Sequence, residues 1–557
     1  MLLTEKTGTL SGKDGVHAEN GTTPHIFGFH AATRVTQTRF HFHMDLCMGC
    51  HACEVACAEQ NGLPVDALWR RVGEVEAGTY PDTRSYFLSS GCNHCLDAPC
   101  LKGCPVEAYQ VNERGVVIHL SDICIGCQYC TWNCPYGVPV YQEDRRIVSK
   151  CDLCTHRLDE GRDPACVQAC PAGAIQIETV PLREVWENYR ETGAGPAMPS
   201  PEISVPSTKI TLPPGMEIED FKRVDRHFVR PEASHPSLIW MTVLTQLGLG
   251  GVATVLLVDL LRTFWGLPLA EGQTLGLLAP FLIGVACLSL GASVLHLGRP
   301  AYVHRALRNW RTSWLSREVL GLGLFAGIAS LYAAFLLVAE GVGLLPAEAL
   351  GGELVRIALG GATVLSGAAG VYSSSMIYRV PARPAWNTAK TTADFFLAAL
   401  ILGPAAFALA VGLAAGWGRE SSPYLPGCAR AAALFAGLAL LAKTALHAAG
   451  VRQWGKSQVF ELEACAQLYR EHFSLVRGVK NLLILLALAC LWPIICGATA
   501  PGQGAYNAAA AAALAALTAG ALLQRHLFFV AVVPWNIPGN FLMAAHQAAG
   551  KGQGGPC

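Results

Sequence analysis

The chain changes character near residue 236, where mixed polar and apolar sequence gives way to long apolar stretches. Each stretch approaches the ~20 residues that a helix needs to cross the hydrocarbon core of a bilayer. One buried helix of a soluble protein can imitate a single stretch, but eight in succession point to a membrane. The pattern predicts eight membrane-spanning helices, over residues 237–261, 275–297, 317–339, 353–378, 391–416, 429–450, 478–500 and 505–533.

The sequence before the first span divides into three parts. Residues 1–34 form a polar extension with neither an apolar signal core nor a twin-arginine pair. Residues 35–178 open with alternating polar and apolar positions near Thr38, which predicts a first strand and a folded domain. Residues 179–235 hold eight prolines and few apolar runs, which predicts an extended strap lying on that domain. Residues 236–557 then form the predicted membrane domain.

Sixteen of the 22 cysteines lie within residues 47–170, in four blocks of four. The third block, CIGCQYCTWNCP, has the spacing C-x2-C-x2-C-x3-C-P of bacterial ferredoxins. In that pattern three thiolates of one loop hold one cluster, and the fourth cysteine ligates another cluster. The four blocks are Cys47, Cys50, Cys53 and Cys57; Cys92, Cys95, Cys100 and Cys104; Cys124, Cys127, Cys130 and Cys134; and Cys151, Cys154, Cys166 and Cys170.

This spacing indicates iron–sulfur clusters rather than the other uses of cysteine. Structural zinc needs two C-x2-C pairs for each ion and has no use for the recurring C-x3-C-P. Disulfides need an oxidising compartment and usually occur in small secreted chains. The predicted fold class is therefore an α+β ferredoxin-like four-cluster iron–sulfur domain, followed by an all-α eight-helix transmembrane bundle.

Charge is unevenly distributed, although the chain holds 41 basic and 41 acidic residues in total. Residues 236–557 contain 20 Lys and Arg against 11 Asp and Glu, so the preceding part is acidic. The predicted loops beside the cysteine domain hold most of these basic residues, including Arg299, Arg305, Arg379 and Lys390. By the positive-inside rule we expect the cysteine domain on the cytoplasmic side of the inner membrane. The same arginines can also dock the acidic domain.

Ionisable residues within predicted spans are costly and often functional, and most of them lie toward the cysteine domain. A quinone headgroup bound there would find hydrogen-bond and proton partners near a cluster. Ordinary explanations also exist, because Arg317 with Glu318 can form an ion pair and Lys443 can extend to the interface. The quinone candidates are His296, Arg317, Glu318, Asp394, Lys443 and His447, with Arg525 and His526 at the same end.

Several motifs resemble a known family. The cysteine blocks, with GCNHCLDAPCLKGCP and CIGCQYCTWNCPYGVP, resemble the four-cluster iron–sulfur subunit of dimethyl sulfoxide reductase type molybdoenzymes. The apolar half, with SVLHLGRP, SWLSREV and MIYRVPARPAWN, resembles the eight-helix anchor subunit of the same enzymes, which implies a fusion of two subunits. FHFHMDLCMGC, WRRVGEVEAG and TKITLPPG further resemble the cytoplasm-facing, quinone-linked sulfite dehydrogenases.

The resemblance implies how the cysteines combine. The first and fourth blocks would share two clusters, and the second and third blocks would share two more, giving four 4Fe–4S clusters. It also makes His296 of the HLGRP motif the first candidate for a quinone partner. The implied sets are Cys47, Cys50 and Cys53 with Cys170; Cys151, Cys154 and Cys166 with Cys57; Cys92, Cys95 and Cys100 with Cys134; and Cys124, Cys127 and Cys130 with Cys104.

The resemblance further implies electron transfer between a molybdopterin-containing catalytic subunit and the membrane quinone pool, for sulfite oxidation. An alternative is reduction of dimethyl sulfoxide, polysulfide or another S- or N-oxide with electrons from quinol. The sequence offers no substrate pocket, nucleotide loop or nucleophile with its base. We therefore expect a non-catalytic, multi-pass subunit in the lipid bilayer, without a nucleic-acid partner.

Two rival hypotheses concern the membrane half. Haem b needs two axial histidines on facing helices, whereas His296, His447 and His526 are spread one to a span, so no haem is expected. A redox-driven proton-translocating module would need ionisable groups that reach the far side of the membrane. Beyond the residues near the cysteine domain, the spans offer only Asp259 for that purpose.

Overall fold

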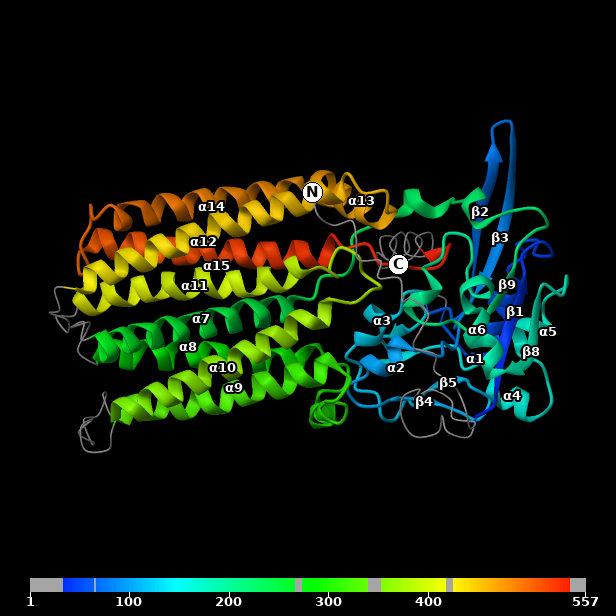
Figure 1. Cartoon of the computed structure of the whole chain (residues 1–557), viewed down its shortest axis with the longest axis horizontal. Helices are drawn as coiled ribbons and strands as arrows, with labels where there is room; N and C mark the ends of the chain where they lie inside the picture. Colours follow the sequence, from blue (N-terminus) through cyan, green and yellow to red (C-terminus); the bar gives the residue numbers. More distant parts are fainter. Residues whose placement is uncertain (1–33, 65–66, 266–272, 339–351, 417–423, 541–557) are drawn as a thin grey trace, which may run out of the picture.

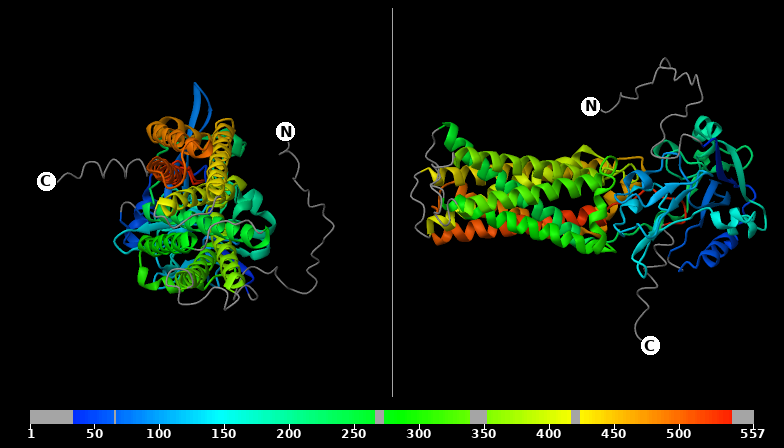
Figure 2. Two further views of the ribbon diagram at one scale, coloured as in Figure 1. Left: turned by 90° about the vertical axis from the view of Figure 1, so that its left-hand side faces the viewer. Right: turned by 90° about the horizontal axis from the view of Figure 1, so that it is seen from below.

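The computed structural model describes residues 34–64, 67–265, 273–338, 352–416 and 424–540. A bundle of long helices forms one end of the molecule, and a smaller domain of strands and short helices forms the other (Figures 1 and 2). The predicted fold class, an α+β domain followed by a helical bundle, is confirmed. The predicted N-terminal extension lies outside the described residues, except for Arg34.

Two three-stranded sheets, in the orders β8-β1-β9 and β10-β2-β3, and two small hairpins, β4-β5 and β6-β7, build the cysteine domain. Helices α1, α2, α3 and α5 each carry at least one cysteine of a different block. The elements are β1 (Thr36–His43), α1 (Ala52–Asn61), β2 (Arg71–Thr79), β3 (Asp82–Ser90), α2 (Pro99–Gly103), β4 (Tyr109–Val111), β5 (Val117–His119), α3 (Tyr129–Asn133), β6 (Val140–Gln142), β7 (Ile147–Ser149), α4 (Thr155–Asp159), α5 (Ala165–Gln168) and β8 (Ile175–Pro181).

Residues 179–235 are more regular than an extended strap. They contain helix α6 (Leu182–Thr192) and strands β9 (Lys209–Thr211) and β10 (Phe221–Arg223). Strand β9 pairs parallel with β1 and β10 pairs antiparallel with β2, so the segment completes both sheets. In α6 the apolar positions recur at helical spacing, and Leu182 and Val185 are buried. The prolines between these elements led to the prediction of an extended segment.

Long helices build the membrane domain in two groups of four. Helices α7 to α10 form one group, and α11, α12, α14 and α15 form the other, with α7 packed on α11 (Figure 1). The short helix α13 (Phe460–Gln467) lies between α12 and α14. The long helices are α7 (Pro236–Trp265), α8 (Gln273–Ser293), α9 (Trp314–Leu336), α10 (Gly352–Tyr378), α11 (Ala389–Gly416), α12 (Leu425–Trp454), α14 (Ser474–Ile495) and α15 (Gly504–Val530).

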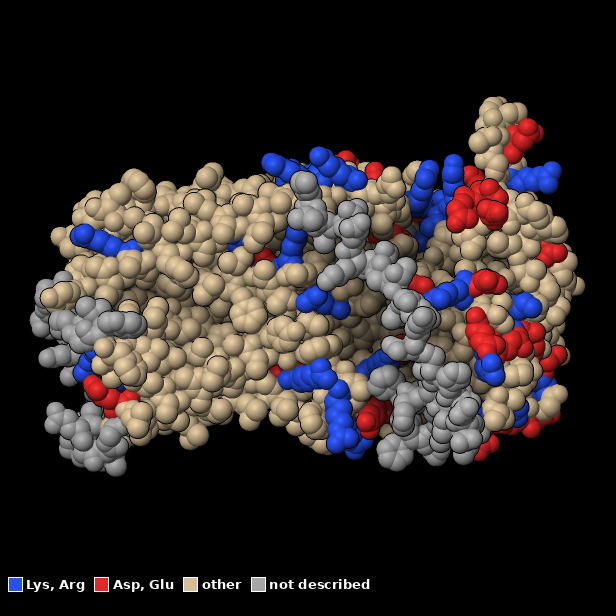
Figure 3. Space-filling model, in the orientation of Figure 1, with Lys and Arg blue, Asp and Glu red and all other residues tan. Residues whose placement is uncertain are grey.

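The bundle has the composition of an integral membrane domain. Among the described residues, seven helices are long and apolar enough to cross a bilayer, and an eighth span results if the bent pair Pro280–His296 and Pro300–Leu307 counts as one. Figure 3 shows uncharged residues over most of the bundle, with Lys and Arg near the end that faces the cysteine domain and a few charged residues at the opposite end. Helices α7 and α11 approach closely at Gly250 and Gly403, where a Cβ would overlap the facing backbone.

The connection between α8 and α9 joins the bundle to the cysteine domain. It contains the 3-10 turns Val294–His296 and Pro300–Leu307. The Asn309 side chain donates to Cys104 O at 2.9 Å, and Ser313 Oγ donates to Gly103 O at 2.7 Å. These side chains satisfy carbonyls at the end of α2 that no turn of the helix can reach. Arg299 donates to Ser121 O at 3.0 Å, next to the third cysteine block.

Residues after α15 turn back onto the cysteine domain. Ile537 is buried in the core of that domain. The Gly539 N–H donates to Asp225 Oδ2 at 2.8 Å, and Arg223 holds the same carboxylate at 3.0 Å. The strap and this tail therefore fix the cysteine domain against the end of the bundle from a second direction.

Candidate functional site

Two cavities in the cysteine domain are each lined by four cysteines. In both, three cysteines come from one block and the fourth comes from another, as the family resemblance implies. The cavity of about 320 Å³ is lined by Cys47, Cys50, Cys53 and Cys170, called group A. The cavity of about 360 Å³ is lined by Cys92, Cys95, Cys100 and Cys134, called group C.

The remaining eight cysteines of the four blocks gather in two further groups. Their sulfurs lie near enough for charges on them to interact. Cys57 meets Cys151, Cys154 and Cys166 in group B. Cys104 meets Cys124, Cys127 and Cys130 in group D.

The four groups suit clusters better than single ions. Within the described part of the chain, no three His, Cys, Asp or Glu side chains surround a point in the way one metal ion requires. The sulfurs of groups A and C surround a cavity instead. Burial raises the pKa of Cys57 to about 12 and that of Cys104 to about 11, so these thiols keep their protons until a positive centre binds them. An iron–sulfur cluster is such a centre and is held by thiolates.

The first and third blocks share a loop conformation that explains their spacing. Gly49 and Gly126 stand directly before the second cysteine of their blocks, with φ of 67° and 68°. His51 and Gln128 follow that cysteine, with φ of 59° and 60°. Left-handed backbone is readily adopted by glycine but costs other residues ~1 kcal/mol or more. The repeated turn therefore aims successive thiols of each loop toward one centre.

The groups follow one another in the order A, B, C, D. Cys53 of group A lies beside Cys166 of group B. Cys151 of group B lies beside Cys92 of group C. Between groups C and D, the buried Tyr109 lies near both Cys100 and Cys130.

Two buried cations stand between neighbouring groups. Arg70 is 3% exposed and lies among cysteines of groups A and B. Its guanidinium donates to Ser89 Oγ at 3.1 Å, and that hydroxyl is 3.3 Å from Cys53 Sγ. Lys150 is also 3% exposed, lies among cysteines of groups B and C, and donates to Cys151 O at 2.8 Å. Each cation can offset the negative charge of two thiolate-bound clusters.

Trp132 connects group D with the membrane domain. It lies in α3 between Cys130 and Cys134. Its ring centroid is 5.7 Å from that of Trp386, 5.8 Å from that of Tyr378 and 5.3 Å from that of His235. Cys127 of group D packs against the same cluster of side chains, so aromatic rings lie between group D and the ends of the membrane helices.

The predicted quinone residues on the first helix group do not all come together. His296 lies near His235, which packs on Trp132. Glu318 is buried beside Ser374, near Tyr129 of α3. Arg317 turns outward instead, with its Nε donating to Trp310 O at 3.1 Å and its guanidinium 4.3 Å from the Trp314 ring. The suggested ion pair between Arg317 and Glu318 is thus not formed.

The predicted residues on the second helix group do come together. Asp394 is 3.3 Å from Lys443 and 3.6 Å from Arg525. Gln524 Nε2 donates to His447 Nδ1 at 3.1 Å, and Gln524 Oε1 accepts from Lys480 at 3.1 Å.

Sequence reasoning missed Lys480 and Gln524. Lys480 stands two residues into the predicted span over 478–500, so a search for charge within spans would have found it. Gln524 carries no charge and gave no comparable signal.

Comparisons with known proteins agree with this architecture. Residues 83–180 match the family described as a 4Fe-4S dicluster domain, and residues 233–529 match the DMSO reductase anchor subunit family. One chain of the anaerobic dimethyl sulfoxide reductase of Escherichia coli is 35% identical over 183 residues, which cover 31% of this protein and 88% of that relative. A sulfite dehydrogenase subunit of Allochromatium vinosum is 35% identical over 189 residues, which cover 30% of this protein and 79% of that relative. The iron–sulfur subunit of the arsenate respiratory reductase of a Shewanella species is 30% identical over 209 residues, which cover 27% of this protein and 89% of that relative.

The fold, the grouped cysteines and these matches define an iron–sulfur electron-transfer domain joined to a membrane anchor. The protein belongs to the dimethyl sulfoxide reductase family, as a fusion of its iron–sulfur subunit and its anchor subunit. The resemblance seen in the sequence is thereby confirmed.

The position of Arg70 generates a prediction about redox potential. Arg70→Met removes a buried positive charge beside groups A and B. Without this charge, adding an electron to a neighbouring cluster is less favourable. We expect the reduction potential of at least one cluster to fall by on the order of 50 mV, near the ~59 mV that a tenfold change represents for one electron. Redox titration followed by electron paramagnetic resonance measures the potentials. Arg70→Lys keeps the charge, so its potentials should lie close to those of the unmodified chain. Unchanged potentials in Arg70→Met would contradict the assigned role.

Proposed function

We propose that this chain carries electrons between a molybdopterin-containing catalytic subunit and the quinone pool of the cytoplasmic membrane. The observation that carries the proposal is the row of four cysteine groups, which runs from the protein surface at group A to Trp132 at the membrane helices. Groups A to D would each hold one 4Fe–4S cluster, and the bound clusters would supply one-electron transfer chemistry. No haem takes part.

The exposed end of the row is where the catalytic subunit docks. Cys50 of group A is exposed, and the neighbouring apolar side chains Met48 and Val55 are 61% and 68% exposed. Apolar side chains around a redox centre favour a partner that excludes water there. The relatives named above are subunits of dimethyl sulfoxide, sulfite and arsenate enzymes, which supports a separate catalytic partner.

The reaction served by the complex is sulfite oxidation. This choice rests on the motifs around the first cysteine block and on the match to the sulfite dehydrogenase relative. Electrons then flow from group A to group D and reduce quinone. The equal identity to a dimethyl sulfoxide reductase relative keeps the reverse flow, from quinol to an S- or N-oxide, as the second candidate.

Quinone meets the chain at the end of the bundle that faces group D. The buried ionisable residues His296, Glu318, Asp394, Lys443 and His447 lie toward that end, and the family motif favours His296. The basic loops on the same side support a cytoplasmic location for the cysteine domain. Protons for quinone reduction are therefore drawn from the cytoplasmic side.

The proposed ligand sets predict the outcome of removing Cys57. The intact chain should contain about 16 iron atoms, and Cys57→Ser should contain about 12, because one four-iron cluster loses a ligand. Its paramagnetic resonance spectrum should match that of Cys154→Ser, from the same group, rather than that of Cys50→Ser, from the same block. A spectrum that matches Cys50→Ser instead would overturn the exchange of the fourth cysteine between blocks.

A second experiment tests electron exchange with quinone. The full-length chain is placed in lipid vesicles without its catalytic partner, and its clusters are reduced chemically. Added quinone with a decyl tail should reoxidise the clusters, seen as recovery of their visible absorbance, because the membrane half itself brings quinone to group D. Clusters that stay reduced with quinone, yet are oxidised by a water-soluble oxidant, would refute the quinone assignment.

A further inference from the structure

A cavity opens at the end of the second helix group that faces the cysteine domain. This outer part is open to solvent and lies between α11, α12 and α15. Trp386 and Phe528 form one wall, with stacked rings 4.9 Å apart at an angle of 11°. Trp386 also packs on Trp132, so this wall is the aromatic layer next to group D.

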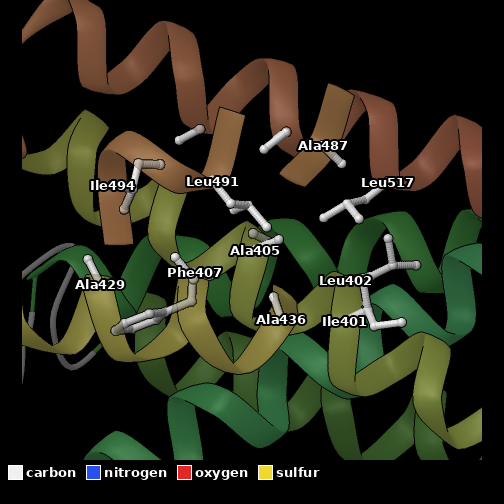
Figure 4. Close-up of a cluster of buried hydrophobic side chains, with 14 of the residues drawn as sticks. Ile401, Leu402, Ala405, Phe407, Ala429, Ala436, Ala487, Leu491, Ile494 and Leu517 are labelled. Carbon is white, nitrogen blue, oxygen red and sulfur yellow. The ribbon is translucent and has the colours of Figure 1, made fainter. Parts of the chain in front are cut away.

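The cavity continues between α11, α12, α14 and α15. This inner part is lined mainly by apolar side chains. Ile401, Leu402 and Leu517 are among them and belong to the core of the bundle (Figure 4). Lys443 and His447 line both parts, so the two parts meet at a polar neck.

The neck presents a buried hydrogen-bond donor that has no acceptor among the described residues. His447 Nδ1 accepts from Gln524, which places the proton of the neutral ring on Nε2. That Nε2 is buried and has no hydrogen-bond partner in the described part of the chain. Lys443 Nζ, on the same helix, lies 3.3 Å from Asp394 Oδ1 and donates to Asp394 O at 3.2 Å, which leaves one of its three N–H groups for a ligand. A buried donor without a partner, such as His447 Nε2, is costly unless a ligand completes its hydrogen bond.

Positive charge also exceeds negative charge at the neck. Lys443 and Arg525 share the carboxylate of Asp394. Lys480 is 4% exposed and bonds to the neutral groups of Tyr469 and Gln524 at 3.1 Å each. Among the described residues, no carboxylate lies within 4.0 Å of the Lys480 amine. Three largely buried cations around one carboxylate favour a ligand that offers electron-rich oxygens.

The cavity therefore calls for a ligand with two different ends. Its head must be small, flat and rich in acceptor oxygens, to lie at the neck against the aromatic wall. Its remainder must be a hydrocarbon chain, to fill the apolar inner part. A quinone with an isoprenoid or alkyl tail has both ends, whereas the bulky phosphate head of a phospholipid has no use for a flat aromatic wall.

We propose that this cavity binds the quinone headgroup, with one carbonyl oxygen accepting from His447 Nε2 and the other from Lys443. The inference rests on the proposed function and places its quinone step on the second helix group, apart from His296. Two electrons arrive one at a time from group D through the Trp132 layer, and two protons come from water on the cysteine-domain side. One quinone thus becomes one quinol, and no other oxidant or reductant is required.

Photolabelling locates the bound quinone directly. The probe is an azido-substituted benzoquinone with a decyl tail, added to the full-length chain in lipid vesicles and mapped by mass spectrometry. Label is expected on peptides of α12 and α15 around His447 and Gln524, and excess unlabelled quinone should prevent it. His447→Leu and Lys443→Met should lower the labelling at least tenfold with iron content unchanged, while Lys456→Met, at an exposed lysine, should leave it within twofold.

A further variant distinguishes loss of quinone binding from general disruption of the polar neck. Ala521→Leu adds volume to the inner, apolar part and touches no charged group. It should also lower labelling, since the leucine side chain would occupy the space of the quinone tail. Labelling at residues near His296, or prevented by an anionic phospholipid but not by quinone, would overturn the cavity assignment and leave the proposed function standing. If quinone neither labels the chain nor reoxidises its clusters, the proposed function itself fails.

Discussion

The contact between the α8–α9 connection and the second and third cysteine blocks determines how the two halves work together. Asn309 and Ser313 donate hydrogen bonds to the last carbonyls of α2, and Arg299 reaches a carbonyl beside the third block. Buried carbonyls without partners are costly, so these bonds hold the cysteine domain in one orientation. That orientation places α3, and with it Trp132, against the membrane helices.

Electron transfer through protein depends on short distances between carriers, and this fold supplies them by exchanging cysteines. Because each group takes its fourth sulfur from another block, two groups share the same two loops and lie close together. Arg70 and Lys150 occupy the space between neighbouring groups, where thiolate-bound clusters concentrate negative charge. The fusion of both subunits in one chain further keeps the last group fixed against the bundle.

Much of this architecture could be predicted from the sequence, because ligand spacing and apolar length are local properties. The spacing around Cys124 indicated a cluster, and its partner Cys104 followed from a family resemblance rather than from geometry. Strands β9 and β10 of the strap escaped prediction since they are three residues long and gain stability only by pairing with β1 and β2. Likewise, nothing local shows that Arg317 turns away from Glu318, or that Lys480 and Gln524 meet His447 across helices.

The central claim is that electrons leave the row of clusters at group D. The most direct measurement compares Cys124→Ser, which damages group D, with Cys50→Ser, which damages group A, in vesicles with the remaining clusters reduced. The rate at which a decyl-tailed quinone reoxidises those clusters should fall at least tenfold in Cys124→Ser and stay within twofold of the unmodified chain in Cys50→Ser. Equal rates in the two variants, or a slower rate in Cys50→Ser, would contradict the account.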